Sequence, residues 1–461
     1  MRHIDVQQMA DHARFNRFHG LVLLWCALII VFDGYDLAVV GIALPSIMKD
    51  LGVDPTQAGF MGSAALFGML FGAIFLGAVA DRIGRRWAIT ICILLFSLFT
   101  AAAGLTHDPL LFAGSRFLAG LGIGGVMPNV VAHMTEYAPR KMRATLVTLM
   151  FSGYAVGGIL AALLGKGLIE AYGWPSVFFA AALPVLLIPL LLKSLPESMA
   201  FLTAQGRHEE VKRIAARIDP SYEPQASDQI AVSSQTVAHA SAPTRQLFSQ
   251  GRGFSTVMLW VAFFMCLFMV YALSSWLTRL MAGAGYSLGS ALTFVLVLNA
   301  GAIAGAIGGG WLADRFHIKR VLAAMYALAA VSVSLLGFAM PQALLFLVVA
   351  LAGASTIGTQ IVANAYTGQF YPMPIRSTGL GFALGMGRSG AILAPIMIGV
   401  LVSWQLPLQH NFFAIGIPGL IGMVAVLLVD DSKSASAQPE APGNTPAMAT
   451  DRPVAVPAGR H

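Results

Sequence analysis

Two aspartates stand in the middle of the first long apolar segment of the chain. Asp33 and Asp36 lie in the string VFDGYDLAVVGIALP, within an apolar run over 21–44. A helix rises about 1.5 Å per residue, so Asp33 would lie roughly 18 Å from the start of such a helix, near the centre of a ~30 Å hydrocarbon core. Acids at that depth are costly and persist mainly where they carry protons, ions or substrate. We therefore expect Asp33 and Asp36, which share a helical face at i,i+3 spacing, to exchange protons.

Two arginines also fall inside apolar segments. Arg388 lies about 11 residues into its segment, roughly 16 Å deep and close to the level of Asp33. A guanidinium can hold a carboxylate in a bidentate geometry, so we expect Arg388 to bind a substrate carboxylate. Arg116, nearer the end of its segment, is the second candidate. Both could instead be structural counter-ions of the aspartates. Phe32, Tyr35, Tyr154 and Trp276 are candidate aromatic walls of the binding site.

The composition predicts a membrane protein. The chain has 461 residues, of which 57% are hydrophobic and 11% are charged, whereas soluble domains carry about 25% charged residues. Twelve stretches have spanning length. They cover 21–44, 58–80, 88–106, 109–133, 144–166, 174–194, 254–278, 288–312, 321–340, 342–366, 377–402 and 410–429. The expected fold is therefore all-α, with twelve transmembrane helices.

The polar segments divide the chain and orient it. We expect a cytoplasmic N-terminus (1–20), a first six-helix half (21–194), a cytoplasmic linker (195–253), a second half (254–429) and a disordered tail (430–461). A short surface helix is expected at 207–218. Of the 28 Lys and Arg residues, 23 fall in segments on one side of the predicted membrane. Because positive loops stay inside, both termini are expected in the cytoplasm.

The two halves form a repeat with an offset of 233 residues. This offset places Asp81 on Asp314, Gly120 on Gly353 and Gly157 on Gly390. The buried charges do not follow the repeat, since Asp33 falls on Cys266 and Arg116 on Val349. Repeated halves predict a shared scaffold with a binding cavity between them near the midplane. The unique charges would then carry the function.

Several kinds of partner are not expected from these patterns. The net charge of +7 comes from short loops without a nucleic-acid motif, so no nucleic acid is expected. Three cysteines lie singly in apolar segments and show no metal-binding spacing. No catalytic constellation, cofactor, metal or obligate protein partner is expected. The expected surroundings are the lipid bilayer, a small substrate and protons.

Sequence motifs resemble a known family. GAVADRIGRR (77–86), with its degenerate copy GGGWLADRFHIKR (308–320), resembles the loop signature of the major facilitator superfamily. RFLAGLGIGG (116–125) is similar to the fourth-helix motif of that superfamily. Within it, FDGYDLAVVGIALP (32–45) and GMGRSGAILAP (385–395) look like the aromatic acid:proton symporters. So do HMTEYAPRKMRAT (133–145) and YPMPIRSTGLG (371–381). The resemblance implies proton-driven uptake of benzoate-type carboxylates across the inner membrane of a bacterium.

The resemblance also implies a gate latch at the cytoplasmic mouth. Its expected members in the first half are Asp81, Arg82, Arg85, Arg86, Glu136 and Arg143. Their expected counterparts in the second half are Asp314, Arg315 and Arg376. Ion pairs of the latch would hold the outward-open state. For Glu136, an ordinary solvated loop acid is an equal alternative.

Three other functions remain open at this stage. A symporter for another organic anion would share every charge argument and differ only in the cavity walls. A drug:proton antiporter is less favoured, because LMFSGYAVGGILAALLG in the fifth segment lacks the proline of the exporters' helix-five motif. A transporter-like receptor would be expected to carry a large folded cytoplasmic extension.

Overall fold

The computed structural model describes residues 3–225, 228–231, 244–372 and 375–434. Within these ranges, twelve helices are long and apolar enough to cross a membrane, as the sequence predicts. The first half contains α2 (Arg17–Leu51), α3 (Pro55–Ile83), α4 (Arg85–Ala103), α5 (Pro109–Tyr137), α6 (Arg143–Tyr172) and the broken span α7 (Pro175–Ala180) with α8 (Leu183–Ser194). The second half contains α11 (Gly253–Gly283), α12 (Leu288–Arg315), α13 (Ile318–Leu335), α14 (Gln342–Phe370), α15 (Arg376–Ser403) and α16 (Leu408–Leu428).

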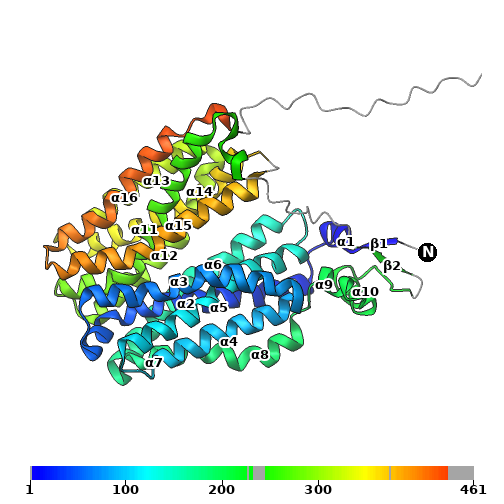
Figure 1. Cartoon of the computed structure of the whole chain (residues 1–461), viewed down its shortest axis with the longest axis horizontal. Helices are drawn as coiled ribbons and strands as arrows, with labels where there is room; N and C mark the ends of the chain where they lie inside the picture. The colour runs from blue at the N-terminus through cyan, green and yellow to red at the C-terminus, as the bar shows by residue number, and fades with distance from the viewer. Residues whose placement is uncertain (1–2, 226–227, 232–243, 373–374, 435–461) are drawn as a thin grey trace, which may run out of the picture.

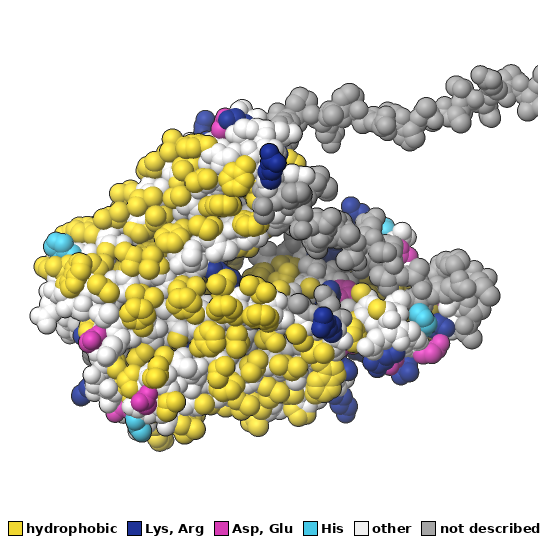
Figure 2. Space-filling model, in the orientation of Figure 1, with side chains coloured by type: hydrophobic (Ala, Val, Ile, Leu, Met, Phe, Trp, Pro, Cys, Tyr) yellow, Lys and Arg dark blue, Asp and Glu magenta, His cyan; other side chains and the backbone are white. Residues whose placement is uncertain are grey.

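The two halves meet at one end of the bundle and diverge toward the other (Figure 1). We call the end that carries α1 (Val6–His12), α9 (Met199–Ala204) and α10 (His208–Ile218) the linker end, and the opposite end the far end. Hydrophobic side chains cover the sides of both halves, and a hollow between the halves faces the linker end (Figure 2). The molecule is therefore open toward one side of the membrane.

Backbone-to-backbone packing joins the halves in the far-end portion of the bundle. A Cβ added to Gly41 of α2 would lie 1.9 Å from the Ser274 carbonyl oxygen of α11. A Cβ added to Gly59 of α3 would lie 2.5 Å from the carbonyl oxygen of Pro395 in α15. The Ser63 hydroxyl donates across the same boundary to a carbonyl oxygen of α15 at 2.7 Å. Only glycine allows helices to approach this closely.

The internal repeat is visible in the helix packing. A Cβ on Gly120 would lie 2.0 Å from the carbonyl oxygen of Ala65, and a Cβ on Gly353 would lie 1.9 Å from that of Leu298. The same offset of 233 residues relates Gly157 to Gly390. A Cβ on Gly157 would lie 2.1 Å from the carbonyl oxygen of Val31, and a Cβ on Gly390 would lie 2.3 Å from that of Phe264. Equivalent glycines thus set equivalent helix contacts in both halves.

A small layer at the linker end joins the N-terminus to the linker. Strand β1 (His3–Asp5) pairs in parallel with β2 (Gln229–Ala231), an addition to the predicted all-α fold. Strands of three residues are too short to produce a periodic signal in the sequence.

Asn16 also connects the N-terminus to the linker. It caps α2 and donates through its amide to the carbonyl oxygens of Arg217 and Ile218 at 3.0 Å each. The predicted surface helix is α10, and 3-10 segments η1 (Thr244–Gly251) and η3 (Asp431–Lys433) complete the described elements.

Candidate functional site

Four side chains from four helices come together between the halves. Asp33 of α2 is within electrostatic reach of Arg388 of α15. Tyr154 of α6 and Tyr271 of α11 are within electrostatic reach of each other and of both Asp33 and Arg388. We call these four residues the midplane cluster. Its helices are the first and fifth spans of each half, so the repeat itself brings them to one place.

Asp33 is fully buried and has no hydrogen-bond donor. Its exposed fraction is 0%, and neither carboxylate oxygen has a partner among the described residues. The neighbouring Gly34 lets α6 approach, because a Cβ there would lie 2.3 Å from the carbonyl oxygen of Tyr154. A charged carboxylate without donors is costly in such surroundings, whereas the protonated acid is not. Asp33 therefore has the environment of a group that takes up and releases a proton.

Asp36 differs from Asp33 because it has a buried cation as its partner. The Arg116 guanidinium donates to Asp36 Oδ2 at 3.0 Å and to the Asp36 carbonyl oxygen at 3.1 Å. It also donates to the hydroxyl of Thr100 on α4. Both charged side chains are only 1% exposed. The sequence predicts Arg116 as a second carboxylate-binding candidate, but here it is engaged inside the first half.

Arg388 remains available for an anion. Its side chain is half-buried and makes no hydrogen bond or ion pair among the residues described. It lies in the second half, while Asp33 lies in the first, so the two charges face each other across the boundary. A planar guanidinium without a protein partner can form two parallel hydrogen bonds with a carboxylate.

The structure does not bring Tyr35 to this cluster. Its hydroxyl donates to the Val177 carbonyl oxygen of α7 at 2.7 Å, and its side chain is only 7% exposed. The ring belongs to the packed core at the far end. Tyr35 follows Asp33 by two positions and precedes Asp36 by one. Its side chain therefore points in a different direction from α2 and faces the interior of the first half. Tyr35 therefore lies in the packed core and not in the midplane cluster.

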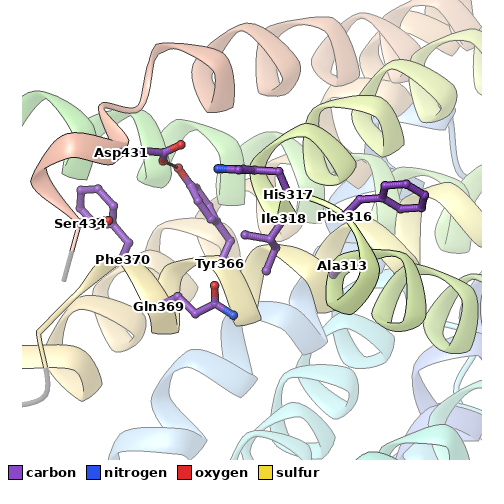
Figure 3. A pocket seen from close by; sticks show the side chains of 9 residues that line it. All are labelled: Ala313, Phe316, His317, Ile318, Tyr366, Gln369, Phe370, Asp431 and Ser434. Atoms are coloured by element: carbon purple, nitrogen blue, oxygen red, sulfur yellow. Dashed lines mark hydrogen bonds between the residues drawn. The ribbon is translucent and has the colours of Figure 1, made fainter. Parts of the chain in front are cut away.

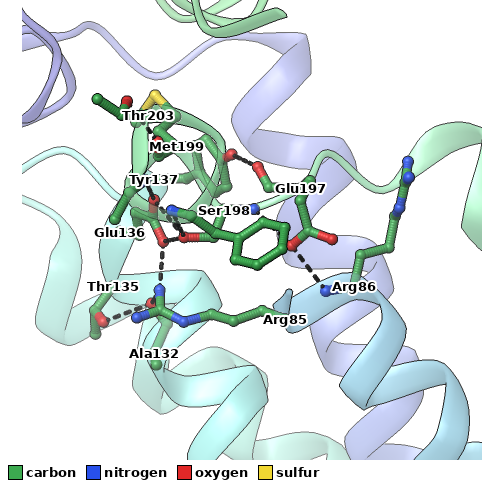
Figure 4. Close-up of polar contacts among 12 residues, drawn as sticks. Arg85, Arg86, Ala132, Thr135, Glu136, Tyr137, Glu197, Ser198, Met199 and Thr203 are labelled. Carbon is green, nitrogen blue, oxygen red and sulfur yellow. Dashed lines mark hydrogen bonds and ion pairs between the residues drawn. The ribbon is translucent and has the colours of Figure 1, made fainter. Parts of the chain in front are cut away.

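A second charged cluster lies at the linker end of the first half (Figure 4). Arg85 forms an ion pair with Glu136 and also donates to the carbonyl oxygen of Ala132. Ser198 donates to both Glu136 oxygens, at 3.1 and 2.9 Å. The backbone N–H of Arg86 donates to Glu197 at 3.1 Å. Glu136 is thus a buried, fully engaged acid rather than a solvated loop acid.

The sequence analysis did not single out Glu197 and Ser198. Both directly follow the sixth span. The offset of 233 aligns Glu197 and Ser198 with Asp430 and Asp431, which directly follow the twelfth span. An acid at the same position in both halves was the available signal. The segment they occupy was interpreted only as the start of a polar linker.

The remaining residues predicted for the latch are dispersed. Arg143 forms an ion pair with Asp11 of α1 at 2.5 Å. Arg376 donates to the Tyr371 carbonyl oxygen at 3.4 Å, and Arg315 lies over the Trp311 ring at 5.2 Å. Four of these residues are exposed: Arg82, Asp314, Arg315 and Arg376. The side chain of Asp81 lies outside the described residues.

The second half carries a pocket at the equivalent position. Its volume is about 410 Å³ (Figure 3). Tyr366 donates to Asp431 at 2.5 Å, and the Lys319 ammonium lies 3.7 Å from the same carboxylate. The offset of 233 places Ile318 and Gln369, which line this pocket, on Arg85 and Glu136. The ion pair of the first half is therefore replaced here by two neutral side chains.

No metal chemistry is indicated by the described part of the chain. Within it, no group of three or more His, Cys, Asp or Glu side chains could hold a metal ion. The three cysteines are buried and free. The midplane cluster combines a buried acid, Asp33, with an arginine, Arg388, that makes no hydrogen bond or ion pair among the described residues.

Twelve spans in two repeated halves with a charged site between them define a membrane transporter. A sequence model of the Major Facilitator Superfamily matches residues 26–309 and 299–458, and the chain belongs to this superfamily of transporters. It is 46% identical to the benzoate transport protein of Acinetobacter baylyi, over 96% of both chains. It is 36% identical to a gallate transporter of Pseudomonas putida, over 92% of this chain and 94% of the relative.

Solved structures agree on the fold. The inward-facing, unoccupied bacterial homologue of the human lysosomal transporter Spinster superposes with a TM-score of 0.71 at 18% identity, covering 92% of this chain and 99% of that structure. The inward-open xylose transporter XylE from E. coli gives a TM-score of 0.67 at 18% identity, with 88% and 94% covered. Both superpositions cover most of each chain, so this chain shares their overall fold.

Proposed function

We propose that this transporter imports a benzoate-type aromatic carboxylate together with a proton across the bacterial inner membrane. The observation that carries the proposal is that Asp33, a buried acid, lies within electrostatic reach of Arg388, and that neither side chain has a hydrogen-bond partner in the described part of the chain. Two relatives that align over most of the chain are named for benzoate and gallate transport, and a third, 33% identical, is named a gentisate transporter from Corynebacterium glutamicum. These names support an aromatic acid as substrate.

Proton coupling follows from the energetics of anion import. A membrane potential that is negative inside opposes a monoanion by about 2.3 kcal/mol per 100 mV. A proton carried with each anion removes this cost and adds the driving force of the pH gradient. The anion neutralises Arg388 and the proton neutralises Asp33, so the loaded site carries no net charge through the low-dielectric middle of the protein. Each ligand then favours binding of the other.

Transport would proceed by alternating access. We assign the linker end to the cytoplasm, because 23 of the 28 Lys and Arg residues lie in segments of that side. The described conformation, closed at the far end and open toward the linker end, then corresponds to the state that releases substrate. Closure of the linker end would bring the Arg85–Glu136 cluster toward the second half, where we propose that Arg376, Asp314 and Arg315 meet the latch of the first half.

The experiment is uptake of radiolabelled benzoate into proteoliposomes that hold purified protein and an inward proton gradient. The wild type should accumulate benzoate above equilibrium. Asp33→Asn should retain exchange of internal for external benzoate but lose accumulation, because Asn cannot cycle a proton. Asp219→Asn, in the linker, is the matched control and should behave as the wild type. Accumulation by Asp33→Asn at the wild-type level would remove Asp33 from the coupling mechanism.

A further inference from the structure

Asn299 of α12 places an amide group at the boundary between the two halves. A Cβ added to Gly158 of α6 would lie 2.5 Å from Asn299 Oδ1 and 2.9 Å from Asn299 Nδ2. Because Gly158 has no side chain, the amide of the second half can occupy this place against a helix of the first. The contact is therefore built from one helix of each half.

The contacts of α6 place this amide at the level of Asp33. A Cβ on the glycine that precedes Gly158 would lie 2.1 Å from the carbonyl oxygen of Val31 and 2.6 Å from the backbone nitrogen of Tyr35. Asp33 lies between Val31 and Tyr35 on α2. One residue of a helix rises about 1.5 Å, so Gly158 and the Asn299 amide lie close to the depth of Asp33.

Asn299 lies on the linker-end side of other contacts between α6 and α12. The Lys166 ammonium donates to the Thr293 hydroxyl at 3.5 Å, and a Cβ on Gly165 would lie 3.5 Å from Leu292 Cδ1. Since α12 begins at the far end, Asn299 follows Leu292 and Thr293 in the direction of the linker end. The halves diverge in that direction, and the hollow between them opens there (Figure 1, Figure 2). Asn299 therefore borders the inner end of the hollow.

The amide of Asn299 has an unused acceptor. Its Nδ2 donates to the Val295 carbonyl oxygen of the same helix at 2.9 Å. Its Oδ1 makes no hydrogen bond to any described residue. The side chain is partly exposed, so this oxygen remains accessible. A polar group in apolar surroundings costs free energy until it finds a hydrogen-bond partner, so a ligand that brings a donor is favoured here.

The repeated scaffold does not require an amide at this position. The offset of 233 places Asn299 on Leu66 and Gly158 on Ala391. Leu66 is 5% exposed and belongs to the hydrophobic core. An apolar side chain thus serves the packing at the equivalent position of the first half. Asn299 is an individual polar feature on a repeated scaffold, which indicates ligand recognition rather than folding.

An aromatic acid offers two kinds of polar group, and only one of them suits Oδ1. A carboxylate can only accept hydrogen bonds, so it pairs with Arg388 and not with an amide oxygen. A ring hydroxyl has a hydrogen to donate. A site built for such a bond discriminates against an analogue that lacks the donor, because its own polar group is then left unpaired.

We propose that Asn299 Oδ1 accepts a hydrogen bond from a ring hydroxyl of the substrate, so that the transporter prefers hydroxylated benzoates to benzoate itself. This inference rests on the proposed function, in which Arg388 binds the carboxylate. It assigns the two ends of the substrate to two helices of the second half, the carboxylate to α15 and the hydroxyl to α12. The hydroxyl is in the meta or para position, since an ortho hydroxyl lies beside the carboxylate and bonds to it.

The test is equilibrium binding to purified full-length protein by isothermal titration calorimetry. The ligands are benzoate, meta- and para-hydroxybenzoate, and the two matching methylbenzoates, whose methyl groups resemble a hydroxyl in size but cannot donate. The wild type should bind one hydroxybenzoate about three- to tenfold more tightly than benzoate and than its methyl analogue, the range for one neutral hydrogen bond. In Asn299→Leu, which introduces the side chain found at the equivalent position of the repeat, this ratio should fall to about one or below. Thr293→Val, on the same helix, is the matched control and should keep the wild-type ratio.

The outcomes separate this inference from the proposed function. If Asn299→Leu does not fold, Asn299→Ala decides the question in the same way. Equal affinity of the wild type for hydroxylated and methylated ligands, or a preference that survives in the Asn299 variants, would overturn this inference alone. A uniform loss of affinity for all five ligands in those variants would also overturn it and assign Asn299 to packing. Failure of the wild type to bind any of these acids, or normal binding by Arg388→Ala, would instead overturn the proposed function beneath it.

Discussion

Replacing Arg116 by alanine should destabilise the protein severely. The change removes three polar contacts of the guanidinium and leaves the Asp36 carboxylate buried without its cation. Both side chains are 1% exposed, so solvent does not screen the interaction. Breaking a buried ion pair by removing one partner costs about 3–5 kcal/mol. This is a large fraction of the about 5–15 kcal/mol by which proteins are stable.

The assay is a double-mutant cycle on unfolding in detergent. Arg116→Gln and Asp36→Asn are each compared with the wild type and with Arg116→Gln/Asp36→Asn, and Arg116→Ala is measured beside them. The neutral double variant should recover most of the stability lost in Arg116→Ala, because no buried charge is left without a partner. Acidification should also restore part of the stability of Arg116→Ala, since protonation removes the isolated charge of Asp36.

One result would refute this reasoning. If Arg116→Ala lost less than about 1 kcal/mol of unfolding free energy, the pair would be no stronger than an exposed salt bridge. If the same variant also lost benzoate binding, Arg116 would be a substrate ligand, as the sequence alone permits. Thr100→Ala, which removes one neutral contact of Arg116, serves as the graded control and should cost about 1 kcal/mol.

Three further predictions follow from the structure. Arg388→Lys should weaken benzoate binding at least tenfold, because an ammonium keeps the charge but lacks the planar fork; an unchanged Kd in titration would exclude bidentate recognition. Uptake in cells should rise with external acidity and collapse with a protonophore, and sodium-dependent uptake that ignores the protonophore would assign a different coupling ion. Gly34→Ala should lower the melting temperature and block transport because its Cβ would lie 2.3 Å from a backbone oxygen of α6, whereas Gly114→Ala, with no heavy atom within 4 Å, should leave both unchanged.

The sequence predicted the architecture because the determinants of membrane folding are local. Apolar length, loop charge and helix-breaking residues can each be read within a short window, so all twelve spans were recognised. The repeat was predicted by a constant offset, and it reappears as equal glycine contacts in both halves. The depth of a residue in the membrane follows from its position along its own apolar segment. This position predicts that Asp33 and Arg388 lie at a similar depth.

The partners of these residues could not be predicted in the same way. Asp36 and Arg116 are 80 positions apart, and only the packing of α5 against α2 makes them a pair. Tyr35 stands beside the aspartates in sequence but turns to α7, while Tyr271, from the other half, reaches the site. Helix periodicity gives the faces of one helix but not the neighbour that each face meets.

What the sequence by itself determined is the class of the protein, the number and approximate positions of its spans, and the repeat. The exact limits of the helices differ, since the first span, predicted at 21–44, is the helix Arg17–Leu51. The tertiary structure alone decided that Asp33 has no hydrogen-bond donor among the described residues, that Arg116 forms an ion pair with Asp36 and that Glu136 is bound by Arg85 and Ser198. The physical reason is that burial and depth depend on composition along the chain, whereas hydrogen bonds require atoms within about 3 Å of each other. Such distances arise only when helices from distant parts of the chain pack together.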